Sequence, residues 1–179
     1  MDYLKSLGLA SRKYILAVGR ITPEKGFDYL IKAFRLAAIE NFSLVIAGGV
    51  EAESSYGEEL KDLAKGTNVV FSGFVQGEKL EQLYTNARLY VLSSLNEGFP
   101  LVLLEAMSYG LDVLVSDIPA THLVELSPDD YFDKENVESL AQGLLRKINS
   151  PLVKREYQLD DFDWQKIANR TGKIYHSLL

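Results

Sequence analysis

Cysteine is absent from this chain of 179 residues, and histidine occurs only twice, at His122 and His176. Because the two histidines are far apart and no thiol is present, the sequence supports neither a zinc site nor a cysteine nucleophile. The lack of cysteine also gives no sign of an oxidising compartment. No P-loop occurs, and no Gly-x-Gly-x-x-Gly follows the first predicted strand, which disfavours P-loop nucleotidases and dehydrogenases.

Positive charge and long hydrophobic runs are also scarce. The chain carries 19 Lys and Arg against 25 Asp and Glu, a net charge of −6, which argues against a general nucleic-acid surface. No stretch is apolar enough to span a bilayer, and Met1 to Tyr3 open without the segments of a secretory signal. We therefore expect one domain over residues 1–179, located in the cytoplasm and without nucleic-acid partners.

Short β-rich runs alternate with segments of helical periodicity along the chain. The predicted strands are Tyr14–Val18, Phe42–Ala47, Asn68–Phe71, Leu89–Ser93 and Val113–Ser116. This alternation predicts an α/β fold, a single Rossmann-like doubly wound parallel sheet with right-handed crossovers and helices on both faces.

Apolar stripes at helical spacing mark the expected core faces of the helices. Three stripes consist of Phe27, Leu30, Ile31 and Phe34; Leu80, Leu83, Tyr84 and Ala87; and Val137, Leu140, Ala141, Leu144, Leu145 and Ile148. After a break at Ser150-Pro151, a final amphipathic helix has its stripe at Trp164, Ile167, Ala168, Thr171, Tyr175 and Leu178. Asp163 is placed to cap this helix, and its apolar stripe requires a covering surface.

Glycine and charged residues follow four of the predicted strands. These groups are Gly19-Arg20 leading to Glu24-Lys25-Gly26, Gly73-Phe74-Val75, Asn96-Glu97-Gly98, and Ser116-Asp117. In open α/β sheets, ligands bind beyond the carboxyl ends of the strands. We therefore expect one edge of the sheet to hold all four groups.

The residues after the first strand suit a diphosphate. Arg20 offers a planar fork and Lys25 a point charge, while Gly19 and Gly26 permit close backbone approach. The alternative is a solvated loop with a surface ion pair between Arg20 and Glu24, which the spacing alone favours.

Two glutamates, Glu97 and Glu105, bracket the segment 98–101. Glu105 interrupts the apolar run Leu101–Met107, so its carboxylate needs either a ligand or a salt bridge beneath the surface. Pro100 suits a first helical turn, and the preceding loop therefore meets a helix N-terminus whose free N–H groups favour anions. Glu97 either interacts with that helix end or binds a ligand.

Two further segments have a structural alternative. The residues of Gly73-Phe74 alone favour a tight turn followed by a core aromatic over a ligand contact. Asp161-Phe162-Asp163 has a spacing that can hold a metal-bound diphosphate, but it introduces the terminal helix, which favours capping and surface charge.

Taken in order, these motifs resemble the C-terminal domain of retaining family-4 glycosyltransferases with the GT-B fold. The motifs are Gly19-Arg20 with Glu24-Lys25-Gly26, Gly73-Phe74-Val75, and Glu97-Gly98-Phe99-Pro100 ending in Glu105. The resemblance spans roughly residues 14–178, and several motifs in order are more specific than any one alone. Trp164-x-x-Ile167-Ala168 also resembles the closing helix of that family. Two departures are Gly110-Leu111-Asp112, where the family often has Gly-x-Pro, and Gly48-Gly49-Val50, which lacks the usual acidic residue.

The resemblance implies a domain that binds a nucleoside diphosphate sugar. Arg20 and Lys25, beside Gly19, would hold the diphosphate, and the backbone around Phe74 and Val75 would meet the base.

The same resemblance implies roles for the two glutamates. Glu105 would bind the ribose hydroxyls, and Glu97, at the catalytic position, would face and orient the sugar. The backbone of Gly98, Phe99, Pro100 and Leu101 would meet the donor sugar and phosphates, in agreement with the helix-end argument above.

The function so implied is that of the donor-binding half of a hexosyltransferase that retains the anomeric configuration and needs neither metal nor cofactor. Residues 1–13 would be a lead-in and 160–179 the closing helix, with the acceptor-binding N-terminal domain, and any peripheral membrane contact, outside this chain. Two alternatives are a nucleotide-sugar epimerase half, which shares the fold, and a non-catalytic nucleotide-binding or interaction module.

Overall fold

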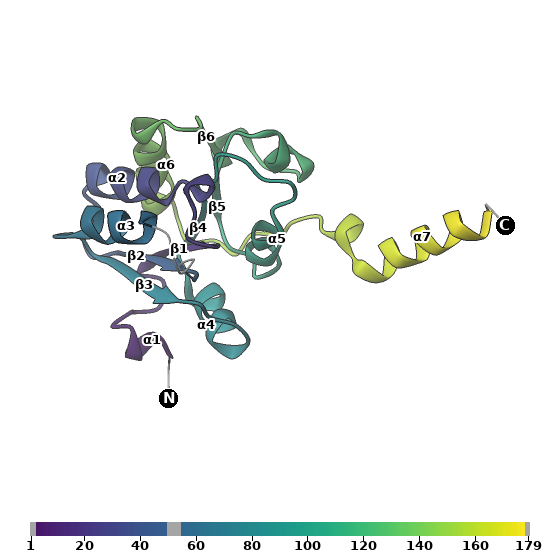
Figure 1. The fold of residues 1–179 in the computed structure, drawn as a ribbon, viewed down its shortest axis with the longest axis horizontal. Helices are drawn as coiled ribbons and strands as arrows, with labels where there is room; N and C mark the ends of the chain where they lie inside the picture. The colour runs from purple at the N-terminus through teal and green to yellow at the C-terminus, as the bar shows by residue number, and fades with distance from the viewer. Residues whose placement is uncertain (1–2, 50–54, 178–179) are drawn as a thin grey trace.

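Six parallel strands form one sheet in the computed structural model, which describes residues 3–49 and 55–177 (Figure 1). The strand order is β3-β2-β1-β4-β5-β6, so the chain reverses direction across the sheet between β1 and β4. The strands are β1 (Tyr14–Val18), β2 (Ser43–Ala47), β3 (Val69–Gly73), β4 (Leu89–Leu92), β5 (Val113–Ser116) and β6 (Tyr131–Phe132). All five predicted strands are present, and β6 has only two residues, too few for a periodic signal.

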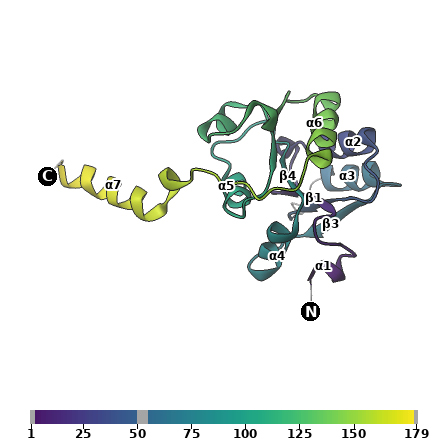
Figure 2. The same cartoon turned by 180° about the vertical axis from the view of Figure 1, so that it is seen from behind.

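Helices cover both faces of the sheet, as the sequence predicts (Figures 1 and 2). The helices are α1 (Tyr3–Ser6), α2 (Phe27–Ala37), α3 (Tyr56–Ala64), α4 (Glu78–Asn86), α5 (Leu101–Ser108), α6 (Val137–Asn149) and α7 (Trp164–Ser177), with short 3-10 turns at Pro23–Lys25, Pro119–Leu123, Pro128–Asp130 and Asp160–Phe162. One core layer lies between the sheet and α2, α3 and α6, and the other between the sheet and α1, α4 and α5. The two layers arise because alternate strand residues point to opposite faces, as Ile15 and Leu16 do. This confirms the doubly wound Rossmann-like sheet.

The third predicted stripe is only partly correct. Leu140 and Leu144 of α6 are fully buried, but Leu145 is 39% exposed. Adjacent helical residues differ by about 100° around the axis, so Leu145 points to the outer side of α6 when Leu144 points inward. The prediction of Leu145 as a core residue was therefore wrong.

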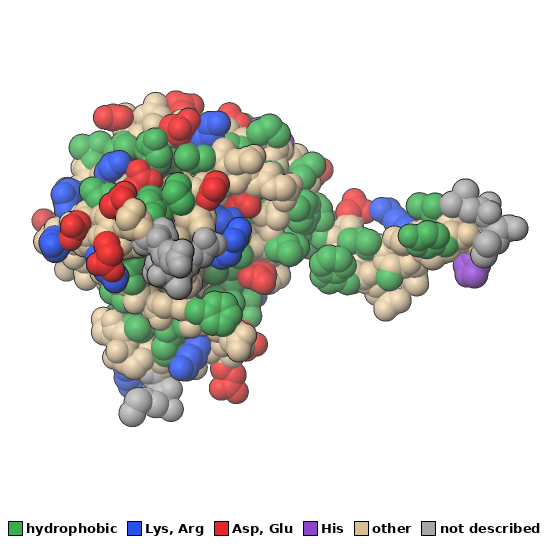
Figure 3. Space-filling model, viewed as in Figure 1, with side chains coloured by type: hydrophobic (Ala, Val, Ile, Leu, Met, Phe, Trp, Pro, Cys, Tyr) green, Lys and Arg blue, Asp and Glu red, His purple; other side chains and the backbone are tan. Residues whose placement is uncertain are grey.

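Helix α7 projects away from the body of the molecule, and hydrophobic side chains lie along it (Figures 1 and 3). Asp163 caps it as predicted, because its Oδ1 accepts a hydrogen bond of 2.9 Å from the Lys166 amide. Trp164 and Tyr175 are 72% and 68% exposed, so the stripe that requires a cover stays open to solvent at these positions. Leu178, the last predicted position, lies outside the described residues, as does Val50. None of the helices in the described ranges combines the length and apolar character needed to cross a membrane.

Candidate functional site

The loop after β1 packs tightly against the ends of two other strands. A Cβ at Gly48 would lie 1.8 Å from the Gly19 carbonyl oxygen, and a Cβ at Gly26 would lie 2.2 Å from that of Ser93. Gly26 also has a left-handed φ of 60°, which favours glycine. The Ser93 hydroxyl donates to the Lys25 carbonyl at 2.8 Å. Gly26 thus permits a close approach to the Ser93 carbonyl of this chain, which brings the ends of β1 and β4 together, while its predicted approach to a diphosphate stays a prediction.

Lys25 and Glu97 form an ion pair at the carboxyl ends of β1 and β4. Lys25 Nζ lies 2.6 Å from Glu97 Oε1, and the side chains are only 18% and 11% exposed. The Ser94 hydroxyl donates to the same Oε1 at 2.7 Å, and Ser116 in turn donates to the Ser94 carbonyl at 2.6 Å. Two residues predicted separately for the diphosphate and the sugar thus meet. The pairing was not predicted, because 72 residues separate them in sequence.

Arg20 is exposed on the same edge. The pKa of the Glu24 carboxyl is lowered by a hydrogen bond from its own backbone amide and one from the Thr22 side chain, and further by Arg20 and Lys25. Both cations therefore lie near this carboxylate. The predicted ion pair between Arg20 and Glu24 is thus represented only by an electrostatic attraction, in a cluster that includes Lys25.

Glu105 has a neutral partner in place of the buried salt bridge considered above. The Tyr84 hydroxyl of α4 donates to Glu105 Oε2 at 2.9 Å, and the Tyr84 ring stacks on Tyr109 with centroids 5.3 Å apart. Burial raises the pKa of Tyr84, and the neighbouring Tyr90 and Glu105 raise it further. The described residues give Glu105 no ion pair, and its side chain is exposed. The salt-bridge alternative is therefore wrong, and the carboxylate is held by one hydroxyl.

Phe74 follows β3 on the surface. Its side chain is 75% exposed, so the alternative of a core aromatic is wrong. Gly73 before it has a left-handed φ of 70°, as a tight turn requires, and Val75 is half-buried. A Cβ at Gly49 would lie 3.7 Å from Phe74 Cβ, so the ends of β2 and β3 meet here. Phe74 therefore presents an exposed ring beside the ends of β2 and β3.

The N-terminus of α5 follows the Glu97 loop. Pro100 occupies the N-cap position, and no side chain caps the helix. Among the described residues, the Leu101 and Leu103 amides donate to the Phe99 and Pro100 carbonyls at 3.0 Å and 2.9 Å, which leaves the Val102 amide of the first turn to a ligand. Gly98 is exposed, and Phe99 and Leu101 are 41% and 50% exposed. The Phe99 ring contacts Phe162 at a centroid distance of 5.7 Å, which links this loop to the segment leading into α7.

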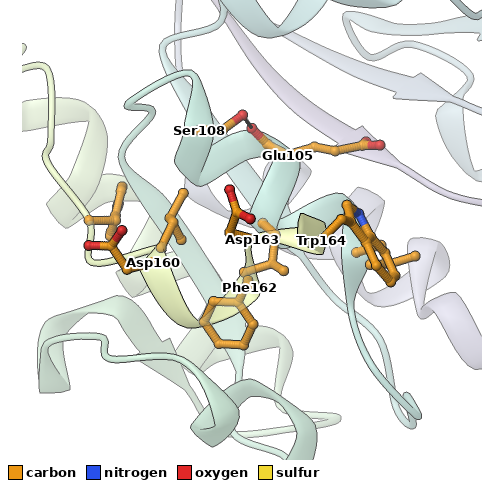
Figure 4. Close-up of a pocket in the computed structure, with 10 residues that line it drawn as sticks. Glu105, Ser108, Asp160, Phe162, Asp163 and Trp164 are labelled. Atoms are coloured by element: carbon orange, nitrogen blue, oxygen red, sulfur yellow. Dashed lines mark hydrogen bonds between the residues drawn. The ribbon is translucent and has the colours of Figure 1, made fainter. Parts of the chain in front are cut away.

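A hollow of about 720 Å³ adjoins this region between α5 and the start of α7. Figure 4 shows Glu105 and Ser108 on one side, and Asp163 and Trp164 on the other. Arg20 and Lys25 do not line it, so it meets the predicted site through Leu101 and Glu105. Asp161 lies 3.5 Å from Arg170 and points to surface pairing, and the described residues contain no group of three His, Cys, Asp or Glu able to hold a metal.

Tyr90 on β4 is a residue that sequence reasoning missed. Its side chain is fully buried, and its hydroxyl is the one buried side-chain atom without a hydrogen-bond partner in the described part of the chain. Burial raises the pKa of Tyr90, and Glu97 and Glu105 raise it further. A tyrosine within an apolar strand looks like an ordinary core residue, so the sequence does not show that it lies near Glu97 and Glu105.

Fold and site together define a Rossmann-like α/β domain whose charged residues, open helix end and exposed aromatic gather at the carboxyl edge of the sheet, where this class binds ligands. The sequence model described as Glycosyl transferases group 1 matches residues 3–160. The chain therefore belongs to the group 1 glycosyltransferase family.

Three relatives illustrate the likeness. An uncharacterized glycosyltransferase of Methanocaldococcus jannaschii is 33% identical over 98% of this chain and 48% of its own length. Sucrose-phosphate synthase of Thermosynechococcus elongatus superposes with a TM-score of 0.81 at 26% identity, over 99% of this chain and 48% of that one. Anabaena HepE, in complex with UDP and glucose, gives 0.73 at 25% identity, over 82% and 41%. The chain thus spans about half the length of these relatives.

Proposed function

We propose that this chain is the donor-binding half of a retaining glycosyltransferase that moves a hexose from a nucleoside diphosphate sugar and needs no metal. The observation that carries the proposal is the meeting of Lys25 and Glu97 beside the uncapped N-terminus of α5. A cation, a sugar-facing carboxylate and the positive end of a helix dipole suit a diphosphate sugar. The complex of the relative HepE with UDP and glucose supports the same donor chemistry.

In this proposal the diphosphate displaces Glu97 as the partner of Lys25. Lys25 and Arg20 then face the phosphates, and the N-terminus of α5 stabilises the negative charge that grows on the leaving diphosphate. Glu97, still bonded by Ser94, is free to orient the sugar, while Glu105 receives the ribose hydroxyls and Phe74 lies beside the base. Acceptor groups and the water-excluding opposite wall come from another domain. On the cysteine-free sequence we also propose a cytoplasmic location.

The test is calorimetric titration of the 179-residue chain with uridine, guanosine and adenosine diphosphates and with their sugar conjugates. We expect one nucleotide to bind modestly, because the opposite wall is not present to close over it. Displacement of the diphosphate by its sugar conjugate would show a shared site. Absence of heat and of competition with all of these ligands would contradict the proposal.

We predict that Glu105→Gln weakens binding of the diphosphate and of its sugar conjugate alike, by about 1–2 kcal/mol, because a charged acceptor becomes a neutral amide. Glu138→Gln, at an exposed glutamate in the first turn of α6, is the control and should change nothing. Calorimetry and thermal melts measure the two effects. A lower melting temperature with unchanged affinity would instead make Glu105 a structural partner of Tyr84.

A further inference from the structure

A second hollow lies at the opposite edge of the sheet, where the strands begin. It measures about 540 Å³, and a smaller one of about 230 Å³ adjoins it. The two share Arg12, Arg88 and Leu152. The chain that leaves α6 crosses this side of the sheet, passes α5 on its way to α7, and supplies Leu152 and Lys154 (Figure 2). The donor site at the carboxyl edge does not use any of these residues.

The two hollows are strongly basic on a protein whose net charge is −6. Their basic lining residues are Arg12, Lys13, Arg88 and Lys154. Glu40 and Asp112 also line them, but Asp112 is already paired with Lys147 and Arg155 at 2.8 Å and 2.9 Å. Among the described residues, four cations therefore line the hollows together with one carboxylate, Glu40, for which no ion pair is seen. Such a local excess of positive charge attracts anions.

Arg12 and Arg88 line both hollows, and their like charges repel. Burial lowers the pKa of Arg88, Asp112 opposes this, and Arg12 lowers it further by repulsion between like charges. Arg88 is only 5% exposed, and its Nη2 donates to the carbonyls of Lys147, Ile148 and Ser150 at the end of α6, at 2.8 Å, 3.5 Å and 2.5 Å. The other nitrogens of its guanidinium make no hydrogen bond to the described residues and are left for a ligand.

Arg12 is fixed in place before any ligand arrives. Its backbone has a left-handed φ of 60°, which is uncommon for arginine. The Arg12 amide donates to the Asn86 carbonyl at 2.8 Å, and its Nη1 donates to the Ala87 carbonyl at 2.6 Å. A cation held this way loses little conformational entropy on binding an anion.

Apolar side chains lie beside the charges. Leu145 and Leu152 line the larger hollow and are 39% and 54% exposed, and Val153 in the smaller one is 62% exposed. Phe42 lies there too, with Lys13 Nζ 5.2 Å from its ring centroid. A ligand that fits carries a phosphate and an apolar group together.

We propose that this basic hollow is a second anion site that binds a phosphate group attached to an apolar moiety. The phosphate lies between Arg12 and Arg88, with Lys13 and Lys154 beside it, and the apolar part contacts Leu152. The same chemistry belongs to a soluble phosphomonoester and to the headgroup of an anionic lipid, and the two sources are separated by experiment.

The probes are inorganic phosphate and two vesicle preparations, phosphatidylcholine alone and phosphatidylcholine with phosphatidylglycerol. Binding of phosphate is followed by amide resonances, and binding of vesicles by co-sedimentation. The protein carries Arg20→Ala and Lys25→Ala, so that the donor edge does not compete. We expect saturable shifts at residues 12–13, 88 and 152–154, weakened about tenfold in Lys13→Gln/Lys154→Gln, because charge-assisted hydrogen bonds to phosphate are lost. Both of these lysines are exposed, so the variant should fold.

Lys166→Gln/Lys173→Gln on the projecting helix α7 removes the same two positive charges far from the hollow, as does Lys173→Gln for a single one, and both should leave the shifts unchanged. Arg12→Gln is a second variant, whose thermal melt separates a loss of binding from a loss of fold. Salt-sensitive sedimentation only with the anionic vesicles would identify a lipid headgroup as the source, and shifts with phosphate alone would identify a soluble phosphate ester. The proposal is overturned if neither probe binds saturably, or if the charge variants of the hollow and those of α7 behave alike.

Discussion

Lys25→Ala is expected to lower both the affinity for the diphosphate and the stability of the folded chain, each by about 1–3 kcal/mol. Binding falls because a charge-assisted contact to phosphate is lost. Stability falls because Glu97, whose side chain is only 11% exposed, keeps its charge without its cation 2.6 Å away. Calorimetry with the diphosphate and thermal melts measure the two losses.

A double-mutant cycle separates the two effects. Lys25→Ala/Glu97→Gln should regain much of the lost stability, since no unpaired carboxylate is left, yet it should not regain diphosphate binding. Glu97→Gln alone should bind the diphosphate at least as well as the wild type, because Lys25 is released, but should discriminate against the sugar conjugate. Unchanged diphosphate affinity in Lys25→Ala, with a normal fold, would remove Lys25 from the donor site.

Asp130→Asn should be the most destabilising of these substitutions, by about 3 kcal/mol, because it breaks a buried ion cluster from one side. Asp130 is 1% exposed and accepts two bonds from Arg155, at 2.6 Å and 3.0 Å. Lys147, itself 6% exposed, donates to the same carboxylate. Asp129→Asn is the matched control, since that neighbouring side chain is 85% exposed and lies 4.0 Å from Arg146. Chemical denaturation measures both variants.

The loss of folding stability in Asp130→Asn should depend on pH. Burial by itself would raise the pKa of Asp130, but the hydrogen bonds from Arg155 and Lys147 outweigh it and hold the pKa below its ordinary value. A carboxyl with a depressed folded pKa stabilises the fold above the pKa of the unfolded chain, and this contribution is lost as the pH falls through the folded pKa. The difference between wild type and Asp130→Asn should therefore be constant near neutrality and shrink in acid. A difference that grows in acid would contradict the assigned cause.

The same cluster explains one departure from the resembled family. Asp112 stands where Gly-x-Pro would place a proline, and its Oδ1 accepts from Lys147 at 2.8 Å and from Arg155 at 2.9 Å. Arg155 belongs to the segment between α6 and α7, so Asp112 helps to fix that segment against the sheet. The sequence showed the substitution but not its partners, because they lie 35 and 43 residues away.

Local periodicity was sufficient for most of the fold. The strands from Tyr14 and Val113 match their predicted bounds, because continuous apolar runs identify strands buried on both faces. It failed for Leu145, because the predicted apolar stripe of α6 included an outward-facing residue. It also failed for β6, because two residues are too few to show a period. The glycine, charged and proline motifs do follow the strand ends, as their local sequence predicts. Whether their side chains bind a donor stays a prediction.

The sequence by itself determined the α/β class, the alternation of elements and the gathering of charged loops at one edge, because these depend on local pattern and on the direction of parallel strands. Only the tertiary structure decided which side chains pair, Lys25 with Glu97 and Tyr84 with Glu105, and that Phe74 faces solvent. The two contacts join residues that are 72 and 21 positions apart in the chain. Local sequence preferences do not specify which distant residues come into contact. The packing of strands and helices decides this.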